Sequence, residues 1–298
     1  MRLPNTRIIV VCLALVAALG TLAACSPVTL INALTPTAAL ERAVDIAYLP
    51  GTNERQRLDV YRPAKARDDA QPQPVVVFFY GGAWQEGSRS DYLFVAEALT
   101  QRGYVVVVPD YRVYPQVKYP DFVNDGAAAV AWTRANISRY GGDPSRLFLM
   151  GHSAGAHIAA LLALDPTYLD AQGLPRSTVK GLIGLAGAYD FLPLTEPNVI
   201  TLFASEPKLA LTQPIHYAPG LSRASLPVLL LHGAADKRVY PKNSVNLARE
   251  LRAAGATVEL ELLPDMGHVD IIAKFTRLLR GDGKIVDRVD QFIRSHSG

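Results

Sequence analysis

The chain has 298 residues, of which 49% are hydrophobic and 19% are charged. It is too long for a peptide hormone or a disulfide miniprotein and too apolar for a disordered chain, so we expect a folded body with a sizeable core. Lys and Arg number 30 against 27 Asp and Glu, without the basic stripe that a nucleic-acid partner requires.

The N-terminus has the pattern of an export signal. Two arginines form a positive start, and an uncharged apolar run follows over residues 8–22. The segment Leu22-Ala23-Ala24-Cys25 resembles the lipobox of bacterial lipoproteins. That resemblance implies a signal peptide over residues 1–24 and a lipidated Cys25 that anchors an exported cell-envelope protein to a membrane. An ordinary cleaved signal and an uncleaved N-terminal helix are the alternatives.

Residues 25–43 contain prolines and no clear period, which predicts a tether before a domain over residues 44–298. In that domain apolar runs rich in β-formers alternate with segments of helical period, which predicts an α/β fold whose mostly parallel central sheet has helices on both faces. An antiparallel hairpin of 44–48 and 58–61 is expected at the sheet edge. Further strands are expected at 75–79, 105–108, 147–150, 182–186, 228–231 and 258–263, and helices at 92–102, 122–139, 154–164, 244–254 and 285–295.

One connection is unusually long. After the strand expected at 182–186, 36 residues from 190 to 225 precede the next strand, and five of them are proline. Ordinary connections have about 4 to 6 residues, and longer ones are usually functional. We therefore predict a small cap insertion over a pocket at about 190–225. The alternative is a surface insertion without a role.

The pentapeptide Gly151-His152-Ser153-Ala154-Gly155 directly follows a predicted strand and opens a predicted helix. This setting is typical of a nucleophile elbow, in which a strained turn lifts a serine above the sheet. Glycines two positions either side leave room for neighbouring backbone, and the helix N-terminus directs free N–H groups at the substrate. Ser153 is therefore the predicted nucleophile.

A serine needs a base, and imidazole is the usual one because its pKa lies near neutrality. In chain order the base follows the acid, which follows the serine, so only His268 and His296 of the six histidines qualify. His296 lies in the C-terminal tail, whereas His268 follows a predicted strand, and His268 is the predicted base. His152 and His157 are expected to pack and form hydrogen bonds around the elbow.

The acid should orient that imidazole and stabilise its cation. Asp236 lies just past the strand predicted at 228–231 and is the predicted acid. Other carboxylates either lie one strand too early or are of the kind that more often caps turns. They are Asp190, Asp110, Asp265 and Asp270.

Donors for an oxyanion are expected in Tyr80-Gly81-Gly82-Ala83-Trp84, which follows the strand predicted at 75–79. The predicted oxyanion hole consists of the N–H groups of Gly82, Ala83 and Ala154, and the alternative is a plain loop. Four apolar residues are predicted to wall an acyl pocket, unless they only pack the cap onto the sheet. They are Trp84, Phe191, Leu202 and Phe203.

Together these segments resemble the α/β-hydrolase superfamily, within it the hormone-sensitive-lipase-like carboxylesterases, and most of all sequences of the isoprenylcysteine-methylesterase and kynurenine-formamidase type. The resemblance implies an α/β-hydrolase fold and a serine hydrolase without metal or cofactor, in which Ser153, Asp236 and His268 form a triad. The family's oxyanion loop usually begins with His, where this chain has Tyr80. The remaining carriers are residues 109–112, 140–146, 232–236 and 267–268.

We therefore expect a membrane-anchored serine carboxylesterase for small to medium acyl esters, acting through an acyl-enzyme. An amide or formamide hydrolase, or a peptidase with the same triad, is one alternative. A non-catalytic binding lipoprotein on a hydrolase fold is the other. A binding protein has no need to keep Ser, Asp and His together, which favours an enzyme.

Overall fold

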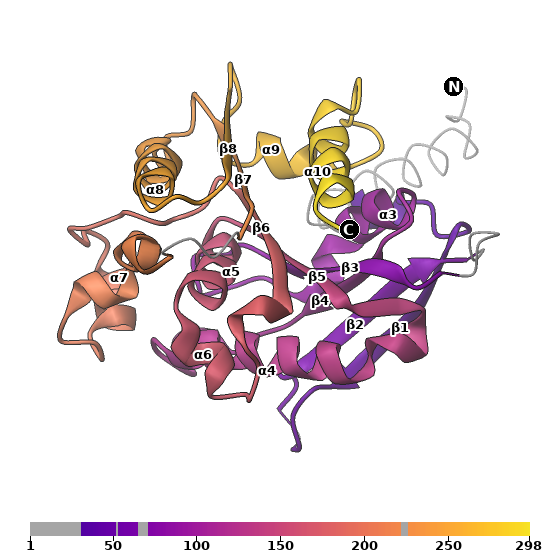
Figure 1. Cartoon of the computed structure of the whole chain (residues 1–298), viewed down its shortest axis with the longest axis horizontal. Helices are drawn as coiled ribbons and strands as arrows, with labels where there is room; N and C mark the ends of the chain where they lie inside the picture. Colours follow the sequence, from indigo (N-terminus) through magenta and orange to yellow (C-terminus); the bar gives the residue numbers. More distant parts are fainter. Residues whose placement is uncertain (1–30, 52, 65–70, 222–225) are drawn as a thin grey trace, which may run out of the picture.

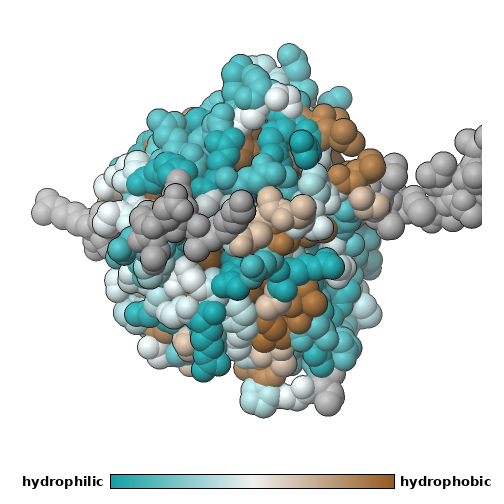
Figure 2. Space-filling view, turned by 90° about the vertical axis from the view of Figure 1, so that its right-hand side faces the viewer, coloured by the Kyte–Doolittle hydropathy of each residue, from teal (hydrophilic) through white to brown (hydrophobic). Residues whose placement is uncertain are grey.

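The structure is a computed structural model that describes residues 31–51, 53–64, 71–221 and 226–298. The predicted signal peptide and the lipidation site Cys25 lie outside these residues, so export and anchoring stay a prediction. No helix in the described ranges is long and apolar enough to cross a membrane. The face in Figure 2 is mostly hydrophilic, and its hydrophobic residues form small patches.

In the described part of the chain, an eight-stranded sheet has the order β1-β2-β4-β3-β5-β6-β7-β8 (Figure 1). The strands are β1 (Leu40–Ala47), β2 (Arg57–Pro63), β3 (Gln73–Phe79), β4 (Val105–Pro109), β5 (Gly142–His152), β6 (Val179–Leu185), β7 (Val228–Gly233) and β8 (Val258–Leu263). β2 pairs antiparallel with β1 and β4, whereas all other neighbours are parallel. The mostly parallel sheet with an antiparallel hairpin at its edge is confirmed.

Helices cover both faces of the sheet, as predicted (Figure 1). They are α3 (Leu93–Thr100), α4 (Asp121–Asn136), α5 (Ala154–Leu164), α6 (Pro166–Asp170), α7 (Pro197–Phe203), α8 (Lys242–Ala253), α9 (Asp270–Ala273) and α10 (Lys284–Ser295). α10 lies beside α3 on one face, and α4 lies beside α5 on the other. Short 3-10 helices are η1 (Arg89–Tyr92), η2 (Ile137–Tyr140), η3 (Arg176–Thr178), η4 (Leu209–Thr212) and η5 (Pro214–Gly220).

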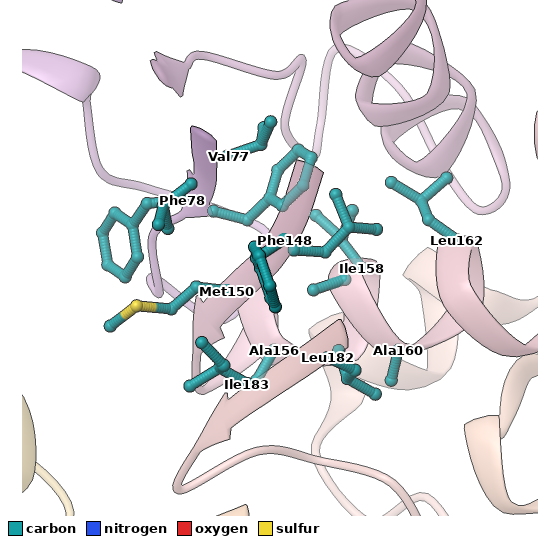
Figure 3. Packing of buried hydrophobic residues seen from close by; sticks show 14 of the residues in the cluster. Val77, Phe78, Phe148, Met150, Ala156, Ile158, Ala160, Leu162, Leu182 and Ile183 are labelled. Carbon is teal, nitrogen blue, oxygen red and sulfur yellow. The ribbon is translucent and has the colours of Figure 1, made fainter. Parts of the chain in front are cut away.

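Alternate residues of the central strands pack on opposite faces, as the pleat requires. Phe148 of β5 meets Phe292 of α10, with ring centroids 6.4 Å apart. Phe79 of β3 lies on the other face, where an ideal Cβ on Gly126 of α4 would come within 3.2 Å of its ring. Figure 3 shows this core, including Ile158 of α5. Every residue of α5 is buried, because the helix lies between the sheet, α4 and η5.

The domain begins earlier than predicted. β1 starts at Leu40 rather than at residue 44, and Ile31 already packs against the core. The β1–β2 ladder shifts register between Ala43 and Ile46, where Asp45 adopts a φ of 62°. Such a bulge breaks the period-two pattern by which a strand is recognised in a sequence. The predicted tether over 25–43 is therefore wrong at its C-terminal end.

The long connection after β6 contains α7, η4 and η5, and residues 222–225 of it lie outside the described chain. It packs on the loop after β3 and on the segment before α4. Asn198 of α7 donates to Gln85 Oε1 at 3.0 Å, and the Tyr119 N–H donates to the Leu202 carbonyl at 3.1 Å. Leu202 has no exposed surface. This cap is thus tied to the body by side-chain and backbone hydrogen bonds.

Arg89 joins three aspartates near the antiparallel edge. Its guanidinium contacts Asp45 at 2.6 Å, Asp59 at 2.9 Å and also Asp110. Asp110 accepts a further hydrogen bond of 2.7 Å from the Tyr80 hydroxyl. The side chains of Asp59 and Asp110 are only 7% and 6% exposed, so each needs a counter-charge in place of water. The network links β1, β2, the end of β4 and the loop after β3.

Replacing Arg89 by Met should lower the free energy of unfolding by roughly 3 kcal/mol, because two buried carboxylates lose their counter-charge. Urea denaturation measures the loss. Arg62→Met is the matched control: Arg62 pairs with Glu41 at the surface, where the side chains are 44% and 51% exposed, and we expect a loss below about 1 kcal/mol. Equal losses in the two variants would contradict a special role for Arg89.

Candidate active site

Ser153 lies at the turn between β5 and α5. Its φ of 56° and ψ of −122° are unusual for a residue with a side chain and are typical of functional turns. An ideal Cβ on Gly151 would lie 2.4 Å from the backbone of Gly155, and one on Gly155 would lie 2.1 Å from the Phe79 carbonyl oxygen. Only glycines at these two positions let β5, α5 and β3 meet, which explains the spacing of the pentapeptide.

The structure brings Ser153, His268 and Asp236 together. His268 Nε2 lies 2.9 Å from Ser153 Oγ, and His268 Nδ1 lies 2.7 Å from Asp236 Oδ2. Asp236 Oδ1 accepts the N–H groups of Arg238 and Val239, each at 2.9 Å. These contacts fit a neutral imidazole that carries its proton on Nδ1 and accepts from the serine at Nε2. All three side chains follow the carboxyl ends of parallel strands, where open α/β sheets bind their ligands.

The competing candidates have other partners. Asp190 accepts from Asn246 at 2.6 Å, and Asp110 belongs to the Arg89 network. Asp270 accepts the Gly267 N–H at 2.6 Å, Asp265 is exposed, and His296 Nδ1 lies 2.8 Å from the Phe292 carbonyl oxygen. Among the described residues, Asp236 is the carboxylate in contact with His268.

His152 and His157 form hydrogen bonds around the elbow, as the sequence predicts. Nε2 of His152 lies 3.0 Å from the backbone oxygen of His268, and Nε2 of His157 lies 2.8 Å from that of Thr212. Burial lowers the pKa of His152 to about 3 and that of His157 to about 4. Both rings are therefore neutral near pH 7, and each donates its proton to a carbonyl.

His232 lies beside Asp236, and the sequence predicts no separate role for it. It is fully buried, with Nδ1 2.7 Å from Ser244 Oγ and Nε2 2.8 Å from the Val239 carbonyl oxygen. Its ring also lies 3.3 Å from Asp236 Oδ2. It therefore supports the turn whose N–H groups bind Asp236. The available signal was its position at the end of β7, four residues before that aspartate.

The loop after β3 lies against the nucleophile. An ideal Cβ on Gly81 would come within 3.0 Å of Ser153 Cβ. Gln85 and Glu86 both donate to the Gly82 carbonyl, at 2.9 and 3.0 Å, and form a tight turn. Within the described ranges the N–H groups of Gly82 and Ala83 donate to no other residue. Ala154 is the first residue of α5, so its N–H also has no partner within the helix.

Tyr80 supports this loop at the position where the family resemblance implies a His. Its hydroxyl donates to Asp110, and its ring stacks on Tyr111 at 4.8 Å and on Tyr92 at 5.4 Å between centroids. The Tyr111 hydroxyl in turn donates to the Tyr80 carbonyl at 2.8 Å. Burial raises the pKa of Tyr80 well above its ordinary value, so the phenol stays protonated. The loop is thus held by an aromatic stack and one buried carboxylate.

Of the four predicted pocket residues, Leu202 and Phe203 have no exposed surface and Trp84 is 6% exposed. Phe191 is half-buried, and its ring centroid lies 5.7 Å from that of Trp84. Phe203 meets the same indole edge-on at 5.1 Å. The structure therefore groups the three aromatic residues at the loop after β3, where Trp84 and Phe191 retain some exposed surface. Their role as a pocket wall stays a prediction.

The model of the BD-FAE family matches residues 58–251. The chain belongs to the BD-FAE family. The BD-FAE match includes the loop after β3, Ser153 and Asp236 but ends before His268, whose Nε2 lies 2.9 Å from Ser153 Oγ. The predicted resemblance to hormone-sensitive-lipase-like α/β-hydrolases is confirmed.

Relatives of this BD-FAE chain include the two predicted types. A probable isoprenylcysteine alpha-carbonyl methylesterase of Oryza sativa subsp. japonica is 33% identical over 82% of this chain and 62% of its own length. Esterase LipC of Mycobacterium tuberculosis is 31% identical, over 74% of this chain and 58% of its own length. The kynurenine formamidase of Danio rerio is 31% identical over 77% of this chain and 75% of its own length. The chain thus spans less than two thirds of the first two relatives.

Solved structures agree with the fold. Esterase 2 of Thermogutta terrifontis superposes with a TM-score of 0.69 at 26% identity, covering 87% of this chain and 96% of that one. A truncated carbohydrate esterase from gut microbiota reaches a TM-score of 0.74 at 20% identity, covering 88% and 98%. The BD-FAE chain therefore has an α/β-hydrolase fold.

The neutral buried histidines make stability depend on pH. The pKa of His152 is about 3 when folded, against about 6.5 for an ordinary histidine, so between these values the unfolded chain binds the additional proton. This contribution to the free energy of unfolding is complete above about pH 6.5 and falls as the pH is lowered. For each such histidine the loss is at most about 1.4 kcal/mol per pH unit. His152→Gln should therefore show a shallower loss between pH 6.5 and 4 in chemical denaturation. An unchanged slope would refute this.

Proposed function

We propose that this BD-FAE protein is a serine carboxylesterase that hydrolyses small to medium acyl esters through an acyl-enzyme. The observation that carries the proposal is the chain of short contacts from Ser153 through His268 to Asp236, beside N–H groups that have no partner among the described residues. A nucleophile, a base, an orienting acid and oxyanion donors are the parts that acyl transfer requires.

In the proposed mechanism Ser153 Oγ attacks the ester carbonyl carbon while His268 Nε2 accepts its proton. Asp236 stabilises the imidazolium through Nδ1–H, and the N–H groups of Gly82, Ala83 and Ala154 bind the oxygen that gains negative charge. His268 then protonates the leaving alkoxide, and the acyl group stays on Ser153. A water molecule, deprotonated by His268, attacks the acyl carbon and releases the acid and the free serine.

The related proteins support this reading. Two of the relatives described above are named as esterases, one of them for methyl esters. One solved form of the Thermogutta terrifontis esterase 2, 25% identical to this chain, is phosphonylated by sarin. Reaction with an electrophilic phosphorus centre is the behaviour expected of an activated nucleophile.

Formamide hydrolysis is the second candidate, favoured by the likeness to kynurenine formamidase over three quarters of that protein. The same triad would protonate a leaving nitrogen instead of an oxygen. Rates on nitrophenyl esters, N-formyl anilides and peptide amides distinguish an esterase from a formamidase. For an esterase, the ratio of ester to amide rates should far exceed the ratio of the uncatalysed rates. A binding protein without catalysis would turn over none of them.

Ser153→Ala and His268→Ala should each lower kcat on nitrophenyl butyrate by roughly a thousandfold or more, because the two residues act as one unit. The double variant should be little worse than either single one. His296→Ala, which changes a histidine of the C-terminal tail, serves as the control and should retain wild-type kcat. If Ser153→Ala kept most of the hydrolysis, the proposed mechanism would be wrong.

Acyl length should have an optimum at short chains if Trp84 and Phe191 wall the acyl site, as the sequence predicts. Each added methylene should raise kcat/KM roughly fourfold, equivalent to about 0.8 kcal/mol, until the chain meets this wall. A series of nitrophenyl esters measures it, and Phe191→Ala should move the optimum to longer chains. Activity that rises steadily through long-chain esters, and on emulsified lipid, would show a site that the cap does not bound.

A further inference from the structure

We propose that Trp84 and His157 are positioning residues that hold the oxyanion loop in its strained conformation, and that the cap completes this support through Thr212. The inference rests on the proposed function, because it assigns the N–H groups of this loop to the oxyanion. It goes beyond that function by giving roles to a buried histidine and an indole N–H that the triad mechanism does not use.

The loop needs such support. Ala83 and Trp84 follow one another with φ values of 51° and 59°, a left-handed conformation that residues with side chains rarely adopt. Gly82 before them has a φ of 135°, and an ideal Cβ there would lie 2.1 Å from the Glu86 carbonyl oxygen. Two consecutive strained residues persist only where their surroundings over-determine them. In the proposed mechanism, a relaxed loop would no longer direct the Gly82 and Ala83 N–H groups at the oxyanion.

The Trp84 side chain provides the restraint. Its Nε1–H donates to His157 Nδ1 at 3.3 Å, and its ring lies edge-on to the imidazole with centroids 5.0 Å apart. Phe203 and Phe191 of the cap contact other parts of the indole, at 5.1 and 5.7 Å. The Trp84 carbonyl accepts the Tyr114 N–H at 2.9 Å, so the backbone is fixed as well.

His157 has the proton arrangement that this contact requires. Its Nε2 lies 2.8 Å from the Thr212 carbonyl oxygen, a contact that only an N–H can satisfy, so the neutral ring presents a bare Nδ1 to the indole. Burial lowers the pKa of this imidazole to about 4, so the ring is neutral near pH 7. His157 also donates its backbone N–H to the Ser153 carbonyl at 3.2 Å, one turn along α5. One residue thus links nucleophile turn, oxyanion loop and cap.

The test is a double-mutant cycle on the full chain with nitrophenyl butyrate. Trp84→Phe keeps an aromatic ring but removes the N–H, and His157→Gln keeps a donor for Thr212 but removes the ring acceptor. We expect each to lower kcat 10- to 100-fold with KM changed less than threefold. The double variant should be no less active than the less active of the two single variants. Affinity for a trifluoromethyl ketone, whose serine adduct carries an oxyanion, should fall by the same factor as kcat/KM.

Trp132→Phe, in the chain's other tryptophan, is the matched control and should leave kcat and ketone affinity unchanged. Three results would overturn the positioning role. They are an unchanged kcat in Trp84→Phe, strictly additive losses in the double variant, and a raised KM with unchanged affinity for the ketone. A Ser153→Ala variant that stays active would instead reject the proposed function, whatever the two positioning variants do. Thermal denaturation of each variant identifies any loss that comes from unfolding.

Discussion

Three backbone segments meet at the nucleophile turn with no room for one additional carbon atom. Gly155 brings the start of α5 against the carbonyl groups of Phe79 and Tyr80 at the end of β3. This contact sets the height of Ser153 above the sheet and the distance from it to the loop that follows β3. The proposed triad and the proposed oxyanion donors therefore depend on one glycine that belongs to neither set. A methyl group here would separate them before it altered any reactive atom.

The electrostatics of the site depend on which buried groups carry protons and on the acceptors to which these protons are donated. Asp236 is buried, but His268 and two backbone N–H groups surround its oxygens. His152 and His157 are neutral, and each gives its proton to a backbone carbonyl. His268 is thus the imidazole of the described chain that faces Ser153 with a free lone pair. Burial disfavours the charged forms of His152 and His157. His268 is therefore left as the proposed proton acceptor of Ser153.

The central strands and the meeting of Ser153, Asp236 and His268 were predictable because each depends on local pattern: continuous apolar runs for buried strands, and polar residues where those runs end. The start of β1 was not, since the bulge at Asp45 interrupts its alternation. The support of Tyr80 by Asp110 and of Trp84 by His157 joins residues 30 and 73 positions apart. Such partners are fixed by the packing of whole elements, and no spacing rule within a single sequence reveals them.

The complete burial of α5 has a consequence for the dynamics of the site. Amides in a helix that is buried along its whole length are expected to exchange with solvent at close to the rate of global unfolding. We expect the turn that carries Ser153 to share this slow exchange, because it opens the same buried helix. The geometry of Ser153 should therefore stay the same from one turnover to the next, whatever movement of other segments substrate entry requires.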